Sequence, residues 1–102
     1  MSSKENSQEL EPRVTVYSKP SGCQACKITL RVLDDASIAY NKIIVRETDI
    51  NLIDELKREA EALGVNGEMP CVYVFDPSTE DTDVWFGFRP DKLDELKEKF
   101  AS

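Results

Sequence analysis

The sequence changes from the apolar period of a strand to that of a helix around a short turn, and two cysteines lie at this change. The segment Val14–Tyr17 alternates as a half-buried strand does, and Lys19–Gly22 is rich in residues that form turns. Cys23 and Cys26 then open an amphipathic segment. The first cysteine is therefore expected at the start of a helix, at the positive end of its dipole.

The rest of the chain continues this succession of strands and helices. We expect strands at 13–18, 40–46, 71–75 and 83–86, and helices at 23–35, at 52–63 and from Pro90 onward. The order is then β-α-β-α-β-β-α. Two consecutive strands joined by a helix run parallel, whereas a hairpin is antiparallel. The expected fold class is therefore α/β, with a four-stranded mixed sheet flanked by three helices.

Apolar spacing predicts which side of each element is buried. The first helix carries a stripe that should face the sheet, made of Ala25, Ile28, Val32, Leu33 and Ala36. The run Ile43–Val45 is β-branched, which is typical of a buried strand. Asn51 is expected to be the N-cap of the second helix, with Asp54 in the capping-box position and Gly64 as the left-handed cap at its end.

Composition limits the chain to a small globular protein with few kinds of partner. Its 102 residues suffice for one domain, which we expect over residues 13–102 after a disordered N-terminal extension over residues 1–12. The formal net charge of −7 argues against nucleic acid and anionic membranes as partners. No apolar run has the length of a membrane span, and residues 1–7 lack the apolar stretch of a secretory signal. We therefore expect a cytoplasmic protein.

The cysteine and histidine counts narrow the chemistry. The chain has three cysteines and no histidine, so a zinc site within one chain would need a carboxylate or an external ligand. We expect neither a bound metal nor an organic cofactor. A papain-like cysteine hydrolase is excluded because its nucleophile is activated by a histidine. Zinc binding and a pair of buried structural thiols are the alternatives to redox chemistry, which the strand–turn–helix context favours.

The thiols are expected to have different roles. Cys23 benefits from the unpaired N–H groups of the helix start, and Lys19 and Lys27 add positive charge nearby, so its thiolate should be stabilised. Cys26 lies one turn further along and should be more buried. We therefore expect Cys23 to attack a partner disulfide and Cys26 to resolve the mixed disulfide. Cys71, at the head of a central strand, is expected to be a small buried apolar residue.

Several residues outside the motif have more than one interpretation. Pro70 precedes the third strand, and the sequence supports only a suspicion of a cis peptide bond there. Trp85, Phe86 and Phe88 are core or hairpin-edge residues by default, but part of this cluster could form an exposed apolar patch that docks a protein. The two interpretations are balanced for Trp85, and a core position is favoured for Phe86.

The N-terminal motif resembles that of the glutaredoxin-like branch of the thioredoxin superfamily. The run Val14–Pro20, then Cys23 and Cys26, and later Met69-Pro70 before a strand, is similar to the pattern of a glutaredoxin. This resemblance implies a thioredoxin-like fold.

A second motif makes the resemblance more specific. The segment Trp85–Asp91, with the sequence WFGFRPD, is similar to the Trp-Ser-Gly-Phe-Arg-Pro signature of NrdH-redoxins, the small electron donors to class Ib ribonucleotide reductase. The likeness extends over about residues 13–100. A glutathione-using glutaredoxin usually has a Gly-Gly-x-Asp-Asp-like turn in this place. Here Gly87–Pro90 stands in place of that turn, with bulkier side chains and with Pro90, which lacks an N–H. The glutathione anchor is therefore expected to be absent.

The resemblance implies a function and a set of site residues. It implies a dithiol–disulfide oxidoreductase, expected to act as a monomer, that passes electrons from thioredoxin reductase to the large subunit of ribonucleotide reductase. It also implies that Cys23 and Cys26 form the redox-active disulfide and that Pro70 is a cis-proline facing it. The residues expected to contact the partner are Met69, Pro70, Trp85, Phe88 and Arg89.

The chain also departs from the NrdH-redoxin pattern. Ser21-Gly22 lengthens the active-site loop, and Gln24-Ala25 stands between the cysteines where x-Gln is common. Phe86 replaces the usual serine, and Asp76–Asp83 suggests an enlarged hairpin loop. These differences leave alternatives open: a glutathione-dependent glutaredoxin or mycoredoxin, an iron–sulfur cluster carrier that uses Cys23 from two chains, and a redox-inert binding module.

Overall fold

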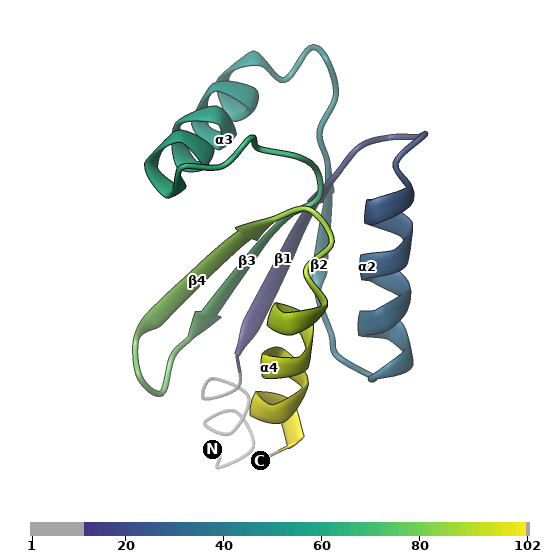
Figure 1. Cartoon of the computed structure of the whole chain (residues 1–102), viewed down its shortest axis with the longest axis vertical. Coiled ribbons are helices and arrows are strands. Elements are labelled where there is room, and N and C mark those ends of the chain that lie inside the picture. Colours follow the sequence, from purple (N-terminus) through teal and green to yellow (C-terminus); the bar gives the residue numbers. More distant parts are fainter. Residues whose placement is uncertain (1–11, 102) are drawn as a thin grey trace, which may run out of the picture.

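The computed structural model describes residues 12–101, and within them the elements follow the expected order (Figure 1). The strands are β1 (Arg13–Ser18), β2 (Asn41–Ile44), β3 (Cys71–Asp76) and β4 (Asp81–Phe86). The helices are α2 (Gln24–Asp35), α3 (Ile50–Leu63) and α4 (Pro90–Ala101). None of these helices is long and apolar enough to cross a membrane. The N-terminal extension expected over residues 1–12 lies outside the described residues, apart from Pro12.

The sheet has the mixed pairing that the sequence predicts. Its strand order is β2-β1-β3-β4. β1 and β2, which are joined through α2, run parallel. The β1–β3 and β3–β4 pairs are antiparallel. The α/β fold class, with a four-stranded mixed sheet and three helices, is thus confirmed.

The helices cover the two faces of the sheet unequally. α2 and α4 pack on one face, where they bury a cluster of Val14, Val16, Leu33, Val72, Val74, Trp85, Leu93 and Leu96. On the other face, Leu56 and Ala60 of α3 pack with Cys71 and Phe86. Successive residues of a strand point to opposite faces, so β3 contributes to both clusters. Figure 1 shows α3 over only one end of the sheet, the end at which α2 begins. The second face is therefore only partly covered.

The buried side of α2 differs from the predicted stripe. Its buried residues are Cys26, Thr29 and Leu33, whereas Ala25 and Ile28 are only half-buried. Residues 26, 29 and 33 share one side of a helix at the i, i+3, i+7 spacing. The sequence of α2 allows either of two neighbouring sides of the helix to be buried. In the structure the buried side is the one that carries Cys26.

The second strand and the second helix also differ from expectation. β2 is an edge strand, and Ile43 is 38% exposed rather than buried. α3 begins at Ile50 with Asp49 as its N-cap, so Asn51 lies inside the helix. The Asp49 carboxylate accepts a hydrogen bond of 2.8 Å from the backbone N–H of Arg46, a local turn that sets the helix start earlier. Gly64 ends α3 in the left-handed conformation, as predicted.

The β3–β4 hairpin is tighter than the sequence suggests. β4 begins at Asp81, which pairs with Asp76, so the connection is the turn 77–80 and not a loop extending to Asp83. Asp76 accepts hydrogen bonds from the backbone N–H and the hydroxyl of Ser78, at 3.1 and 2.7 Å, and these bonds fix the turn. Polar residues thus extend β4, which is tolerated because β4 is an edge strand with one exposed side.

Candidate active site

The first cysteine of the motif caps α2. Cys23 is the N-cap in an extended conformation, and its Sγ accepts a hydrogen bond of 3.2 Å from the backbone N–H of Cys26. The carbonyl oxygen of Cys23 accepts the first helical bond, from the N–H of Lys27 at 3.2 Å. The sulfur therefore meets one of the unpaired donors of the helix start, a contact that stabilises a thiolate after reduction.

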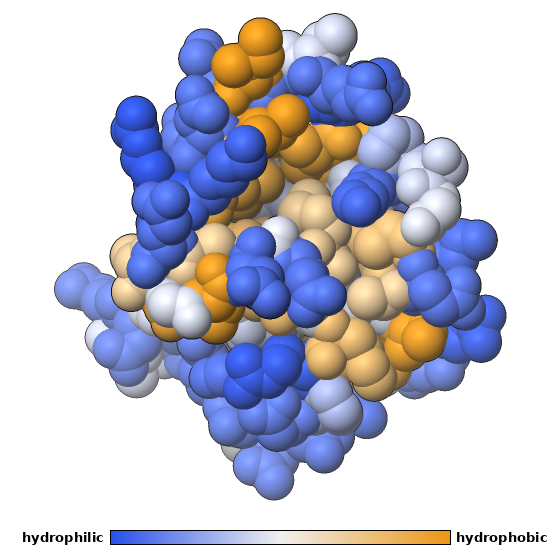
Figure 2. Space-filling model, turned by 45° about the horizontal axis from the view of Figure 1, so that its top comes forward, coloured by the Kyte–Doolittle hydropathy of each residue, from blue (hydrophilic) through white to orange (hydrophobic). Residues whose placement is uncertain are grey.

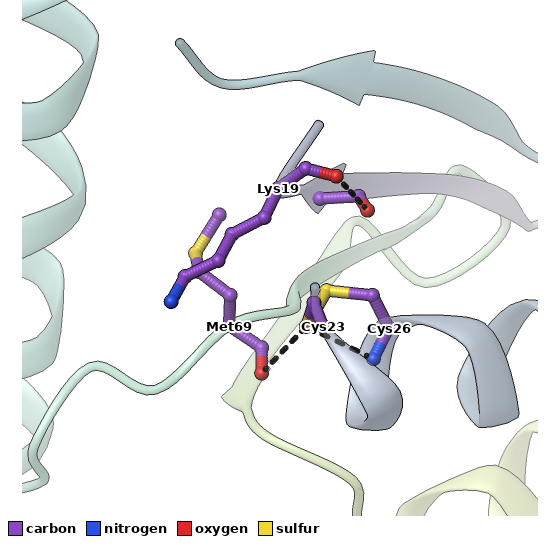
Figure 3. The surroundings of a disulfide bond; sticks show 5 residues. Lys19, Cys23, Cys26 and Met69 are labelled. Carbon is purple, nitrogen blue, oxygen red and sulfur yellow. Dashed lines mark hydrogen bonds between the residues drawn. A yellow bond between two sulfur atoms is a disulfide. The ribbon is translucent and has the colours of Figure 1, made fainter. Parts of the chain in front are cut away.

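The two sulfurs differ in accessibility. The structure holds Cys23 and Cys26 as a disulfide, with their Cα atoms 5.3 Å apart (Figure 3). Cys23 is half-buried, whereas Cys26 is 2% exposed. The expected difference in burial is confirmed. Cys23 is therefore the more accessible of the two cysteines, so the site suits an exchange that begins at Cys23.

Met69-Pro70 faces the disulfide. The peptide bond between these residues is cis, so the suspicion from the sequence is confirmed. The Sγ of Cys23 lies 3.8 Å from the carbonyl oxygen of Met69, as the dashed line in Figure 3 marks. A disulfide sulfur carries no hydrogen, so this is a contact in the oxidised form, and a Cys23 thiol could donate there in the reduced form. A segment distant in sequence thus lies against the sulfur that a partner would reach.

A groove of about 690 Å³ opens beside the motif. The loop before Cys23 forms one wall, and α3 with the loop after β2 forms the other. Its apolar lining consists of Val45, Ile53, Leu56, Ala60, Val65 and Met69. Figure 2, in which the top of the view in Figure 1 comes forward, shows a hollow with hydrophobic residues inside and hydrophilic residues around it. An apolar segment of a partner could therefore lie next to the disulfide.

Charged side chains border this groove. Lys19, Arg46 and Lys57 are the cations that line it, and Glu47 and Glu61 are the anions. The Lys19 side chain extends past Met69 in Figure 3. The sequence indicates Lys19 but not the groove. Its lining residues come from separate segments, and their sequence signal is the ordinary apolar periodicity of α3 and the strands.

The residues expected to bind a partner are placed differently from one another. Met69 lines the groove, and Phe88 is 39% exposed. Arg89 is exposed and forms an ion pair of 2.9 Å with Asp91. Trp85 is 3% exposed and belongs to the core, which favours the packing interpretation of this residue. Their roles in partner binding remain predictions.

The third cysteine is separate from the disulfide chemistry. Cys71 is a free thiol with no exposed surface, which confirms the expected small buried residue. Burial, with a smaller contribution from the negative charge of Glu59, raises the pKa of Cys71 to about 12. The thiol is therefore protonated and inaccessible in the folded protein. Among residues 12–101, no three cysteine, aspartate or glutamate side chains cluster closely enough to hold a metal ion.

Comparison with known proteins places this geometry in a known fold. No protein-family model and no curated protein sequence matches the chain. Among solved structures, NrdH-redoxin from Escherichia coli is similar, with a TM-score of 0.56, 25% identity, and coverage of 82% of this chain and 93% of that one. A glutaredoxin from Archaeoglobus fulgidus has a TM-score of 0.61 and 23% identity, covering 82% of this chain and 84% of that one. A thioredoxin from Schistosoma mansoni has a TM-score of 0.54 and 16% identity, covering 96% and 87% respectively.

The fold and the cysteine pair define the class of protein. The chain has a glutaredoxin-like form of the thioredoxin fold, and its disulfide at the start of α2 supports thiol–disulfide oxidoreductase activity in general. Within this class the chain resembles NrdH-redoxin in structure as well as in sequence. That protein is described as glutaredoxin-like with a thioredoxin-like activity profile.

Proposed function

We propose that this protein passes electrons from thioredoxin reductase to ribonucleotide reductase by thiol–disulfide exchange, with Cys23 as the attacking thiol and Cys26 as the resolving thiol. The observation that carries the proposal is the disulfide at the N-cap of α2, in which the first sulfur is accessible and the second is buried. The likeness to NrdH-redoxin supports the choice of partners.

The proposed cycle begins with the reduced protein. The Cys23 thiolate attacks a disulfide of the partner, forms a mixed disulfide with one partner sulfur and releases the other as a thiolate. The Cys26 thiolate then attacks the Cys23 sulfur, which closes the internal disulfide and releases the second partner sulfur. Two electrons have moved to the partner, whose thiolates take up two protons. The reductase returns two electrons to the Cys23–Cys26 disulfide by the reverse exchange.

The turn after β4 supports a protein reductant over glutathione. The N–H of Gly87 is already bonded to the carbonyl oxygen of Pro70, and Pro90 has no N–H. The carboxylate of Asp91 is paired with Arg89, whose hydrogen bonds hold the pKa of Asp91 below its ordinary value. The backbone and carboxylate groups that a glutathione-binding turn would supply are therefore engaged within the chain.

Coupled electron transfer tests the proposal. NADPH oxidation should be fast with thioredoxin reductase, this protein and the oxidised large subunit of ribonucleotide reductase, and slow with glutathione and its reductase. Cys23→Ser should abolish turnover, and Cys26→Ser should accumulate mixed disulfides with the partner. Cys71→Ala is the matched control, because it removes a thiol that lies outside the exchange, and it should retain turnover. Substantial turnover by Cys23→Ser would refute the assignment.

A glutathione-dependent glutaredoxin is the second candidate, and one observation favours it. Lys19, Arg46 and Lys57 line the groove beside the disulfide, and ammonium or guanidinium groups bind the carboxylates of an anionic tripeptide well. The same assay separates the candidates. Faster reduction by glutathione than by thioredoxin reductase would establish the second function and exclude the first.

A further inference from the structure

A second cavity lies on the other side of α3 from the groove. It has a volume of about 300 Å³ and is lined by residues of α3, β1 and β3. On α3, Glu55 and Glu59 face this cavity, whereas Lys57 and Ala60 face the groove. The helical period puts these two pairs on different sides of the helix, and Leu56 between them lines both spaces. The cavity is thus distinct from the groove beside Cys23.

Two tyrosines form the sheet side of this cavity. Tyr17 of β1 and Tyr73 of β3 lie on the same face of the sheet, with ring centroids 6.2 Å apart in an edge-to-face arrangement. Burial raises the pKa of both phenols, so they stay uncharged at neutral pH. The face of a phenol ring carries partial negative charge and the hydroxyl oxygen accepts hydrogen bonds, so both side chains have groups that attract a cation.

Two glutamates complete the cavity from the helix side. The carboxylate of Glu59 accepts a hydrogen bond of 3.2 Å from the hydroxyl of Tyr73. Glu55 is exposed at the rim, and its negative charge raises the pKa of Tyr17. In the part of the chain that the structure describes, Arg58 is the single cation that lines the cavity, so the described lining has a net charge of −1 from two glutamates and one arginine. Aromatic rings combined with carboxylates suit a cationic nitrogen group, and a volume of this size admits the end of a lysine or arginine side chain.

We propose that this cavity binds a basic side chain, the guanidinium or ammonium group of an arginine or lysine, from the disulfide-bearing client protein. Tyr17, Tyr73, Glu55 and Glu59 contact the cationic group. The identity of the client as a redox partner rests on the proposed function, whereas the affinity of the cavity for a cationic group does not. The negative net charge of the chain favours a client that is basic near its disulfide.

The position of the cavity fits this role. Tyr17 precedes the last residue of β1, the strand that leads into the loop before Cys23. Cys71, the strand partner of Tyr17, directly follows Pro70, whose neighbour Met69 contacts the Cys23 sulfur. The cavity and the disulfide therefore belong to the same end of the sheet. A client whose disulfide reaches Cys23 can place a neighbouring basic side chain against α3.

Binding of a small probe tests the cavity itself. The oxidised full chain is titrated with butylguanidinium, which mimics the end of an arginine side chain, and with the neutral analogue butylurea, while amide shifts are followed by NMR. Butylguanidinium should give saturable shifts at Tyr17, Tyr73 and α3, and butylurea should not. In a double variant with Glu55→Gln and Glu59→Gln the affinity should fall at least about tenfold. Arg58→Gln should strengthen binding, because it removes the competing cation.

A matched control separates local from general charge effects. Asp54→Asn removes one negative charge from α3 at an exposed position that lines neither cavity nor groove. It should leave the affinity for butylguanidinium within about twofold. Equal binding of both probes, or an equal loss in the control and in the glutamate variants, would overturn the cation site.

Kinetics test whether the cationic group belongs to a client. Two peptides with the same internal disulfide carry, on a flexible linker, a terminal arginine amide or its neutral analogue citrulline amide. The reduced wild type should show a lower KM for the arginine peptide, an unchanged kcat, and no preference in the double glutamate variant. Failure to reduce either peptide would refute the proposed function and leave the probe titration as the test of the cavity. Equal KM values with saturable butylguanidinium binding would overturn the role in client binding.

Discussion

The backbone N–H of Gly87 donates a hydrogen bond of 2.8 Å to the carbonyl oxygen of Pro70. This bond joins the turn after β4 to the residue that follows Met69, whose carbonyl oxygen lies against the Cys23 sulfur. Gly87 is buried with φ of +82°, and the nearest atom to a Cβ placed there would be the Cβ of Glu68 at 4.0 Å. Space is available, so the backbone conformation is what selects glycine at this position.

Gly87→Ala is expected to reduce stability and slow the exchange. A side chain in this conformation costs about 1–2 kcal/mol, which urea unfolding can measure. The strain should also shift Pro70 and lower the rate of protein disulfide reduction. Gly64→Ala is the control, because Gly64 has a similar φ of +73° at the C-terminal cap of α3. It should show a comparable stability loss with an unchanged rate, and equal rates for both variants would contradict the positioning role of Gly87.

The buried thiol of Cys71 should lower the free energy of unfolding at alkaline pH. In the unfolded chain the pKa of the thiol is near its ordinary value of 9.0, whereas burial raises the pKa in the folded protein to about 12. The unfolded state therefore loses this proton first as the pH rises, and folding stability falls between about pH 9 and 12. In urea unfolding, the stability of the wild type relative to Cys71→Ala should stay constant from neutral pH to about pH 9 and fall from there to about pH 12. Parallel curves would contradict the raised pKa.

The core on the sheet face that α2 and α4 cover should tolerate little loss of side-chain volume. Leu33 on α2 has no exposed surface, so Leu33→Ala should destabilise the fold by about 2–5 kcal/mol. Leu63→Ala makes the same change at the end of α3, where the side chain is 46% exposed, and should cost within about 0.5 kcal/mol. The two midpoints in urea give the comparison. Equal losses of stability in the two variants would contradict the burial of Leu33 between α2 and the sheet.

Asn51 offers a test of where α3 begins. Inside a helix, Asn51→Ala replaces a poorer helix former by a better one and should stabilise the protein by about 0.5 kcal/mol. Had Asn51 been the N-cap, the same change would cost about 0.5–2 kcal/mol. The sign of the shift in the urea midpoint decides between these positions.

Local sequence patterns were sufficient for β1 and α2. The alternation in Val14–Tyr17 and the turn before Cys23 fix the strand, the helix start and the positions of both thiols within one short segment. The burial of Cys26, and with it the exposure difference between Cys23 and Cys26, depends on which side of α2 faces the sheet, and the packing of the helix decides this. The sequence marks Pro70 as a candidate for the site, but the position of Met69-Pro70 beside the disulfide depends on pairing between distant strands.

The sequence by itself determined the order of the elements, the class of fold and the pair of thiols, because periodicity and capping act over a few neighbouring residues. Only the tertiary structure decided that β2 lies at an edge, that Trp85 is in the core, and that α3 has the groove on one side and the tyrosine-lined cavity on the other. These features arise where segments far apart in the chain meet. The free energy of that packing depends on the surfaces of both segments that meet, and a local sequence pattern describes only one of them.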